Sequence, residues 1–244
     1  MAVRTWARTV LGIGVVAFAA TACTSAPQAA PPTVAGTQPS AVTASPVDVT
    51  TPPRAATETL VLAGGCFWGV QGLFQHVNGV TAAESGYVGG SPETANYDAV
   101  ETGRTAHTEA VKITFDPAQV PESQLLDIFF RVVENPVHLT QLGSDVHATQ
   151  YQSAIYAQDQ TQRDVAETAI AQLDRSAALP GPVVTKVLPA TAFFPAERYH
   201  QDFMYRNPTE PYIAGSEMPK LADLQRQFPE QYREKPVLMF ADDA

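Results

Sequence analysis

The chain has 244 residues, of which 45% are hydrophobic and only 16% charged, with a formal net charge of -10. That length suits one large domain or two small ones, and the composition is not apolar enough for a protein with several membrane spans. The acidic balance removes the counterion release that draws proteins to nucleic acid, so we expect no nucleic-acid partner. The two cysteines are too few for a disulfide framework.

Residues 1–22 have the features of a secretory signal peptide. Arg4 and Arg8 give a basic start, and residues 9–22 form an apolar run that is too short to span a bilayer comfortably. Small residues then lead into Cys23, a pattern that resembles a bacterial lipoprotein box, in which this thiol is lipidated and becomes the mature N-terminus. Ordinary signal cleavage, with Cys23 as an incidental thiol, is the alternative.

Residues 23–58 are expected to form a lipidated cysteine followed by a disordered tether. The stretch is rich in Pro, Ala, Thr and Ser, and residues 24–47 carry no charge. Such a composition cannot bury enough apolar surface to offset the entropy of ordering, and Pro-rich linkers are extended and semi-rigid. Leader and tether together predict a membrane-anchored lipoprotein of the cell envelope that faces the periplasm.

The folded part is predicted to span residues 59–225, followed by an acidic, loosely specified tail at 226–244. Short runs with strand patterns alternate irregularly with runs that have apolar residues at helical spacing. The predicted strands are residues 59–63, 110–115, 153–157 and 182–187, and the predicted helices are residues 67–77, 121–133 and 160–173. This mixture predicts a two-layer α+β sandwich.

Cys66 follows two glycines, at the point where the first predicted strand ends and the first predicted helix begins. The unpaired N–H groups and the positive end of a helix favour a thiolate, which is the reactive form of cysteine. The glycines allow a substrate to approach closely. A buried, unreactive cysteine is the alternative, but Phe67 and Trp68, which follow directly, favour a reactive thiol beside a small apolar pocket.

A series of segments, in the same order, resembles the peptide methionine sulfoxide reductases of the A class over residues 59–215. The segments are GCFWG at 65–69, GYVGG at 86–90, NY at 96–97, TAHTEAV at 105–111, TQYQSAIY at 149–156, YHQDF at 199–203 and NP at 207–208. The resemblance implies a ferredoxin-like α+β fold with a mixed, mainly antiparallel sheet and a long irregular C-terminal segment. It also implies the reduction of methionine S-sulfoxide, either free or in proteins.

The resemblance assigns four catalytic roles. Cys66 is the nucleophile that attacks the sulfoxide sulfur, and Glu109 is a carboxylic acid kept protonated by burial that donates a proton to the sulfoxide oxygen. The hydroxyls of Tyr97 and Tyr151 donate hydrogen bonds to the same oxygen. Without the resemblance, Glu109 would be taken as a solvated glutamate at a strand edge, and the tyrosines as packed aromatic residues.

Substrate binding is assigned to Phe67 and Trp68, whose rings would hold the terminal methyl group of the substrate. Asp145 and His200 match polar residues that line the family's pocket, although a turn aspartate and a hydrogen-bonded structural histidine are common alternatives. The sequence has no metal-ligand spacing and no nucleotide-binding glycine loop. We therefore expect no metal and no cofactor.

Two departures from the family pattern affect the mechanism. The loop at 136–148 is shortened, which puts the role of Asp145 in doubt, and no cysteine follows Cys66. Many relatives carry a resolving cysteine about where Tyr212 stands. We therefore predict a single-cysteine cycle, in which an external thiol, thioredoxin-like or of low molecular weight, reduces the sulfenic acid of Cys66. The alternatives are a thiol peroxidase and a catalytically inactive lipoprotein that binds methionine sulfoxide.

Overall fold

A sheet of six strands in the order β5-β4-β1-β3-β2-β6 forms the centre of the computed structural model, which describes residues 57–138 and 149–241. Neighbouring strands are antiparallel, except for the parallel pair β4 and β5. All of these elements belong to the unit Thr51–Ala244. The strands are β1 (Glu58–Gly64), β2 (Val80–Val88), β3 (Thr108–Phe115), β4 (Ser153–Ala157), β5 (Lys186–Pro189) and β6 (Phe193–Pro195).

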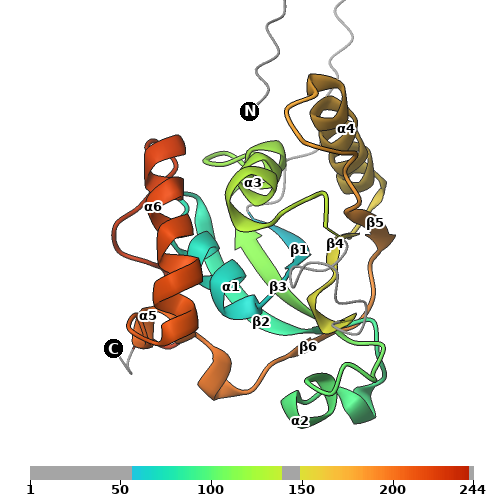
Figure 1. Cartoon of the computed structure of the whole chain (residues 1–244), viewed down its shortest axis with the longest axis vertical. Coiled ribbons are helices and arrows are strands. Elements are labelled where there is room, and N and C mark those ends of the chain that lie inside the picture. The colour runs from blue at the N-terminus through green and yellow to red at the C-terminus, as the bar shows by residue number, and fades with distance from the viewer. Residues whose placement is uncertain (1–56, 139–148, 242–244) are drawn as a thin grey trace, which may run out of the picture. The chain divides into compact units, whose positions relative to one another are not determined.

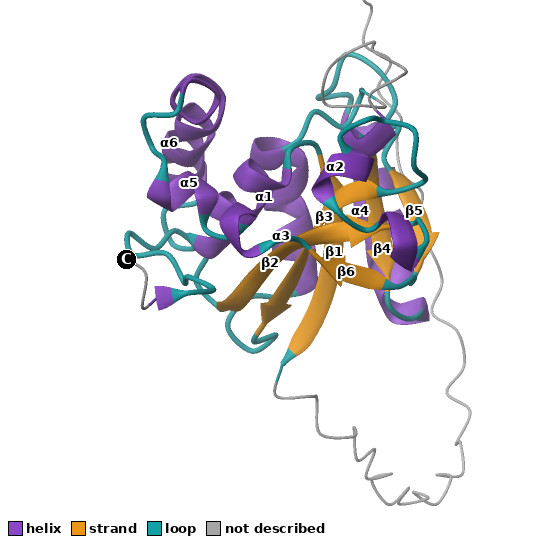
Figure 2. Ribbon diagram, turned by 90° about the horizontal axis from the view of Figure 1, so that it is seen from below, coloured by secondary structure: helices purple, strands orange, loops and turns teal. Residues whose placement is uncertain are grey.

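Helices pack on this sheet and on one another, with α1 and α3 lying across one face (Figure 1) and α5 and α6 beside α1 (Figure 2). No helix among the described residues is long and apolar enough to cross a membrane. The helices are α1 (Phe67–Gln75), α2 (Tyr97–Val100), α3 (Glu122–Ile128), α4 (Gln160–Ser176), α5 (Phe203–Arg206) and α6 (Met218–Gln227). Two π-helical turns adjoin them: Phe129–Val133 continues α3, and Ile213–Glu217 precedes α6.

The element order β1-α1-β2-β3-α3-β4, with inner strands arranged 4-1-3-2, is the split βαβ pattern of ferredoxin-like folds. The α+β fold class is therefore confirmed. β5 and β6 extend the inner sheet at its two edges.

β1 is buried on both faces, which explains its uninterrupted apolar sequence. Leu60 and Leu62 belong to the large cluster under α1 and α3, whereas Val61 and Ala63 belong to a smaller cluster on the opposite face. All four are at most 5% exposed. Full burial of one leucine or valine side chain contributes about 1.5–3 kcal/mol to the stability of the fold. Burial therefore fixes the position of this strand as far as its last residue, Gly64.

Most of the predicted elements are present, with ends shifted by a few residues. The strand predicted at 182–187 is misplaced, because β5 begins only at Lys186, where parallel pairing with Ala154 starts. Val184, just before it, instead donates its N–H to the carbonyl of Pro136. β2 was not predicted, since the middle of its sequence, AAESG, is poor in strand-forming residues. Pairing with β3 and β6 holds β2 extended.

The C-terminal segment is well anchored, which corrects the expectation of a loosely specified tail from residue 226. α6 continues to Gln227, and the segment after it, although irregular, folds back on the end of α1. Arg233 donates from Nη2 to the carbonyls of Val77 (2.7 Å) and Val80 (2.8 Å). The carboxylate of Asp202 accepts the N–H groups of Met239 and Phe240.

We expect Arg233→Met to lower the free energy of unfolding by about 1–3 kcal/mol, because the variant loses two charge-assisted hydrogen bonds that join the tail to the turn after α1. Urea denaturation followed by circular dichroism measures the change. Arg175→Met, at an exposed position in the last turn of α4, is the matched control and should change stability by less than about 0.5 kcal/mol. Equal losses in both variants would contradict the anchoring of the tail.

Candidate active site

The turn between β1 and α1 places Cys66 at the N-cap position of α1, as the sequence predicts. Gly65 adopts φ +97°, in the left-handed region that favours glycine. One turn into the helix, a Cβ on Gly69 would collide with the carboxylate of Glu217. Gly65 therefore allows the turn before the thiol, and Gly69 allows Glu217 to pack closely against the helix after it.

The electrostatic surroundings of Cys66 differ from the expectation of a favoured thiolate. Burial and the nearby carboxylate of Glu109 raise the pKa of the Cys66 thiol well above its ordinary value, and Glu217 adds to this. The N–H groups of Trp68 and Gly69 lower this pKa, as the helix argument predicts, but they do not outweigh burial and charge. The resting cysteine is therefore a neutral thiol at pH 7.

Glu109 lies on β3, 2% exposed, directly behind the first residue of α1. Its Oε2 accepts the N–H of Phe67 at 2.9 Å. Burial raises the pKa of Glu109 to about 8, although the N–H of Phe67 opposes the shift. The carboxyl group is therefore mostly protonated at pH 7, as a proton donor must be.

The charge of Glu109 acts on the thiol of Cys66. A charged Glu109 raises the pKa of Cys66, so protonating Glu109 removes part of the cost of forming the thiolate. When Glu109 is protonated and Cys66 is ionised, the site holds an acid and a nucleophile side by side. This is the combination that attack on a polarised S=O group requires.

Tyr97 and Tyr151 reach the same site from two separate segments. Tyr97 is the first residue of α2, and Tyr151 ends the 3-10 turn Thr149–Tyr151 before β4. Burial raises the pKa of both hydroxyls, and the charges of Glu109 and Cys66 raise them further. Both therefore stay protonated and can donate hydrogen bonds.

The two aromatic residues after Cys66 differ in their surroundings. Phe67 is 1% exposed, and its ring packs in the core against Tyr87. Its main contribution to the site is therefore its backbone N–H, which Glu109 accepts. Trp68 is only half-buried, and its indole stacks on Phe203 with ring centroids 3.7 Å apart. Trp68 is therefore the better-placed apolar wall for a small substrate group.

His200 lies behind Trp68, and its ring centroid is 4.5 Å from that of Tyr97. Its ring is 1% exposed, and Nδ1 accepts the indole N–H of Trp68 at 2.9 Å. Burial lowers the pKa of His200, although Glu197 opposes the shift. Neutral His200 thus fixes the orientation of Trp68. Asp145 and Cys23 lie outside the described residues.

The segment after His200 joins α1 through buried amide groups. Gln71 donates to Gln201 Oε1 at 2.7 Å and accepts the N–H of Asp202 at 2.9 Å. Gln75 donates to Asp202 Oδ1 at 2.6 Å, and Gln201 accepts the N–H of Ser85 at 3.0 Å. These residues resemble a family motif in the sequence, but their observed contacts hold the helix that begins at Cys66.

Three side chains near the site were given no role from the sequence, although Tyr212 was noted as the residue at the position of the resolving cysteine. Glu197 accepts the N–H of Tyr97 at 2.9 Å and so fixes the start of α2. Tyr212 donates its hydroxyl proton to Glu217 at 2.7 Å, and both interact electrostatically with Cys66. No local spacing links these residues to Cys66, since folding alone brings them together.

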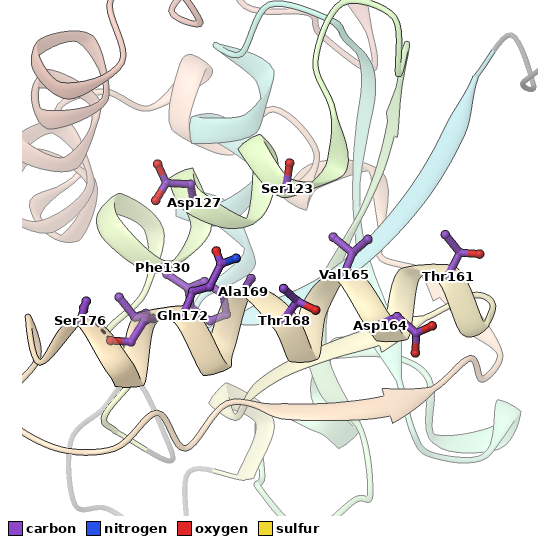
Figure 3. Close-up of a pocket in the computed structure, with 11 residues that line it drawn as sticks. Ser123, Asp127, Phe130, Thr161, Asp164, Val165, Thr168, Ala169, Gln172 and Ser176 are labelled. Atoms are coloured by element: carbon purple, nitrogen blue, oxygen red, sulfur yellow. Dashed lines mark hydrogen bonds between the residues drawn. The ribbon is translucent and has the colours of Figure 1, made fainter. Parts of the chain in front are cut away.

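Other concave regions carry no comparable chemistry. A groove of about 650 Å³ between α3 and α4 is lined by Ser123, Asp127, Phe130 and residues of α4 (Figure 3), and it contains neither a cysteine nor a histidine. Among residues 57–138 and 149–241, no three His, Cys, Asp or Glu side chains are grouped as metal ligands would be. The chemistry of the described residues is concentrated at Cys66.

Comparison with known proteins gives a consistent result. Residues 58–232 match the family model described as peptide methionine sulfoxide reductase. "Peptide methionine sulfoxide reductase MsrA 2" of Mesorhizobium japonicum is 50% identical over 184 residues, which cover 75% of this chain and 94% of the relative. The protein of the same name from Synechocystis is 45% identical over 179 residues, covering 73% of this chain and 81% of the relative.

Among solved structures, methionine sulfoxide reductase A of Corynebacterium diphtheriae superimposes with a TM-score of 0.54 at 30% identity. The superposition covers 65% of this chain and 78% of that chain. Neither a thiol peroxidase nor an inactive binding protein is supported by these similarities.

We expect Glu109→Gln to lower the pKa of Cys66, because the variant removes the negative charge that opposes thiolate formation. Alkylation of Cys66 at pH 8.5 should become faster by on the order of 3-fold or more, which corresponds to about half a pKa unit. The rate of iodoacetamide labelling as a function of pH measures the shift. Glu93→Gln, at an exposed position, should leave that profile unchanged; an unchanged profile in Glu109→Gln would contradict the coupling.

Proposed function

The chain belongs to the peptide methionine sulfoxide reductase family and reduces methionine sulfoxide, and we propose that it does so by a single-cysteine cycle at Cys66. The observation that supports this assignment of the chemistry is the pairing of Cys66 with a buried, protonated Glu109 across the start of α1. Apart from Cys66, the sequence contains one cysteine, Cys23. We take the substrate to be the S epimer, free or in proteins, as the family resemblance implies.

In the first step the sulfur of Cys66 attacks the sulfoxide sulfur while Glu109 donates its proton to the sulfoxide oxygen. The hydroxyls of Tyr97 and Tyr151 donate hydrogen bonds to that oxygen as negative charge develops on it. The thiol proton of Cys66 returns to Glu109, so the carboxyl group is protonated again at the end of the step. The hydroxyl group then passes from the sulfoxide sulfur to the sulfur of Cys66 as the bond between the two sulfurs breaks, so methionine leaves as the thioether and Cys66 becomes a sulfenic acid.

Trp68 binds the methyl group next to the reacting sulfur. Its indole is held by Phe203 on one face and by His200 at Nε1, so its position is set before the substrate arrives. A preformed apolar wall lowers the entropic cost of binding a small flexible group. Phe67 contributes its N–H to Glu109, and Asp145 stays a proposed polar contact.

The second half of the cycle needs electrons from outside the chain. An external thiol attacks the sulfenic acid and forms a mixed disulfide on Cys66, which a second thiol then reduces. Two thiols are oxidised to one disulfide for each sulfoxide reduced, and the oxygen leaves as water. No prosthetic group takes part in this proposal, and either a thioredoxin-like protein or a low-molecular-weight thiol supplies the electrons.

We expect the reduced full chain, mixed with a methionine S-sulfoxide peptide and no reductant, to release one methionine per protein and then stop. Mass spectrometry after dimedone trapping should show the sulfenic acid on Cys66. The burst should disappear in Cys66→Ser and slow by roughly 10²–10⁴-fold in Glu109→Gln, the range typical of a lost general acid.

The pH dependence of this burst has a definite sign. The acid form of Glu109 is required, so the burst rate should fall as pH rises through about 8, where Glu109 loses its proton. Glu109→Gln should lack this decline. Peptide binding without methionine release would instead indicate an inactive binding protein.

We also propose that the enzyme is attached to the cell envelope by a lipid on Cys23 and faces the periplasm, where it would repair oxidised envelope proteins. The basic start, the short apolar run and the Pro-rich stretch after Cys23 support this proposal. Membrane anchoring by lipid depends on the buried acyl chains.

We expect the full chain, expressed in a bacterium, to fractionate with membranes and to incorporate an alkyne-labelled fatty acid. Cys23→Ser should lose both the label and the membrane association, because no thiol is left to acylate. Cys66→Ser is the matched control and should keep both. Recovery of the protein in the cytosol with residues 1–22 retained would contradict the anchor.

A further inference from the structure

Cys66 lies at the boundary between two different sets of side chains, and we propose that a low-molecular-weight thiol reaches it through the second set. This inference rests on the proposed single-cysteine cycle. The second set encloses a cavity of about 420 Å³, which we call the thiol cavity. Its lining includes Cys66, Glu134, Tyr212, Ser216, Glu217 and Lys220.

The thiol cavity is separate from the sulfoxide site. Glu109, Tyr97, Tyr151 and Trp68 are absent from its described lining, so Cys66 is the catalytic side chain that both share. The two sides also come from different elements. The sulfoxide site uses α1, α2, β3 and the turn before β4, whereas the thiol cavity uses the end of β1 and the two π-helical turns with residues that flank them.

Hydrogen bonds hold the walls of the cavity in place. Lys220 donates from Nζ to the carbonyl of Val133 at 3.1 Å and to Glu217 Oε1 at 3.2 Å, so it connects α6 with the end of the first π-helical turn. Tyr212 donates to the same Oε1 at 2.7 Å. Such a network keeps the cavity open without a ligand, which is typical of small-molecule sites.

Glu217 is unusual because it is 1% exposed and its Oε2 has no hydrogen-bond partner among the described residues. Leaving a buried carboxylate oxygen unpaired is costly, and such costs are retained most often at functional sites. Here the carboxylate lies against Gly69, in the first turn of α1, and it acts on Cys66 through its charge.

The size and lining of the cavity favour a small thiol over a protein. Pockets for small molecules start at about 300 Å³, so a cavity of about 420 Å³ is large enough for a small thiol and too small to hold a protein. Most of the residues that line the cavity carry polar side chains. An unbranched thiol can thus approach the sulfur of Cys66 while the sulfoxide site is occupied or empty.

The reaction in the cavity balances without a further reagent. The thiol sulfur attacks the sulfur of the sulfenic acid, the S–O bond breaks, and the hydroxyl group leaves as water with the thiol proton. A second molecule of the same thiol attacks the mixed disulfide, which returns the Cys66 thiol and releases the oxidised disulfide.

The test fills the cavity with a side chain at its exposed edge. Ser216 is exposed and lines the cavity, so Ser216→Trp should lower kcat/KM for mercaptoethanol by about 10-fold or more. The burst of one methionine per protein, measured without thiol, should keep its amplitude. Gly215→Trp is the matched control, because a Cβ at Gly215 meets no atom within 4 Å and the residue is not part of the lining.

The two halves of the assay can fail separately. An absent burst in the unaltered chain contradicts the proposed function, whereas equal thiol rates in Ser216→Trp and Gly215→Trp with normal bursts overturn the cavity proposal. If Ser216→Trp loses its burst, the same measurements are made on Ser216→Leu, and the same two outcomes decide whether the cavity proposal stands. A thioredoxin-like protein is run in parallel, and slowing with that protein alone would overturn the assignment to a small thiol.

Discussion

The burial of Glu109 against the first amide of α1 is the interaction on which the rest of the site depends. A charged carboxylate that loses its hydration is costly in a protein interior, and one N–H group recovers only part of that cost. The group therefore keeps its proton near neutral pH. Because β3 and α1 are fixed by the core, the acid and Cys66 are held together before any substrate is present.

The same arrangement opposes the thiolate and makes its formation conditional. The helix start offers N–H groups to the sulfur, yet burial and two carboxylates outweigh them. A free thiolate would be open to unproductive oxidation, whereas a thiol that ionises only beside a protonated Glu109 is nucleophilic when the acid is ready. The position of α1 is in turn set by Gln71 and Gln75, whose amides bond to the segment after His200.

Sequence patterns predicted those parts of the structure that depend on local spacing. β1 is a short uninterrupted apolar run, whereas α1 and α4 have apolar residues at helical spacing, and the position of Cys66 between a strand and a helix followed from these patterns. β2 and the C-terminal segment could not be predicted, since pairing with β3 specifies the first, and hydrogen bonds that Arg233 donates and Asp202 accepts specify the second. The expected direction of the Cys66 pKa shift was wrong for the same reason: burial of the thiol and then the charges of Glu109 and Glu217 raise this pKa, and all three depend on contacts between residues distant in sequence. His200 was recognised by resemblance, but only its contact with Trp68 shows how it acts.

The two π-helical turns, Phe129–Val133 and Ile213–Glu217, carry a consequence for the evolution of this protein. A π turn holds an extra residue within an otherwise α-helical path, so a deletion of one residue in Ile213–Glu217 would restore α-helical geometry. Each residue in an α-helix turns the chain by about 100°, and Tyr212 would then no longer face Glu217. Insertions and deletions, more than substitutions, are therefore the changes by which relatives could gain or lose the second approach to Cys66.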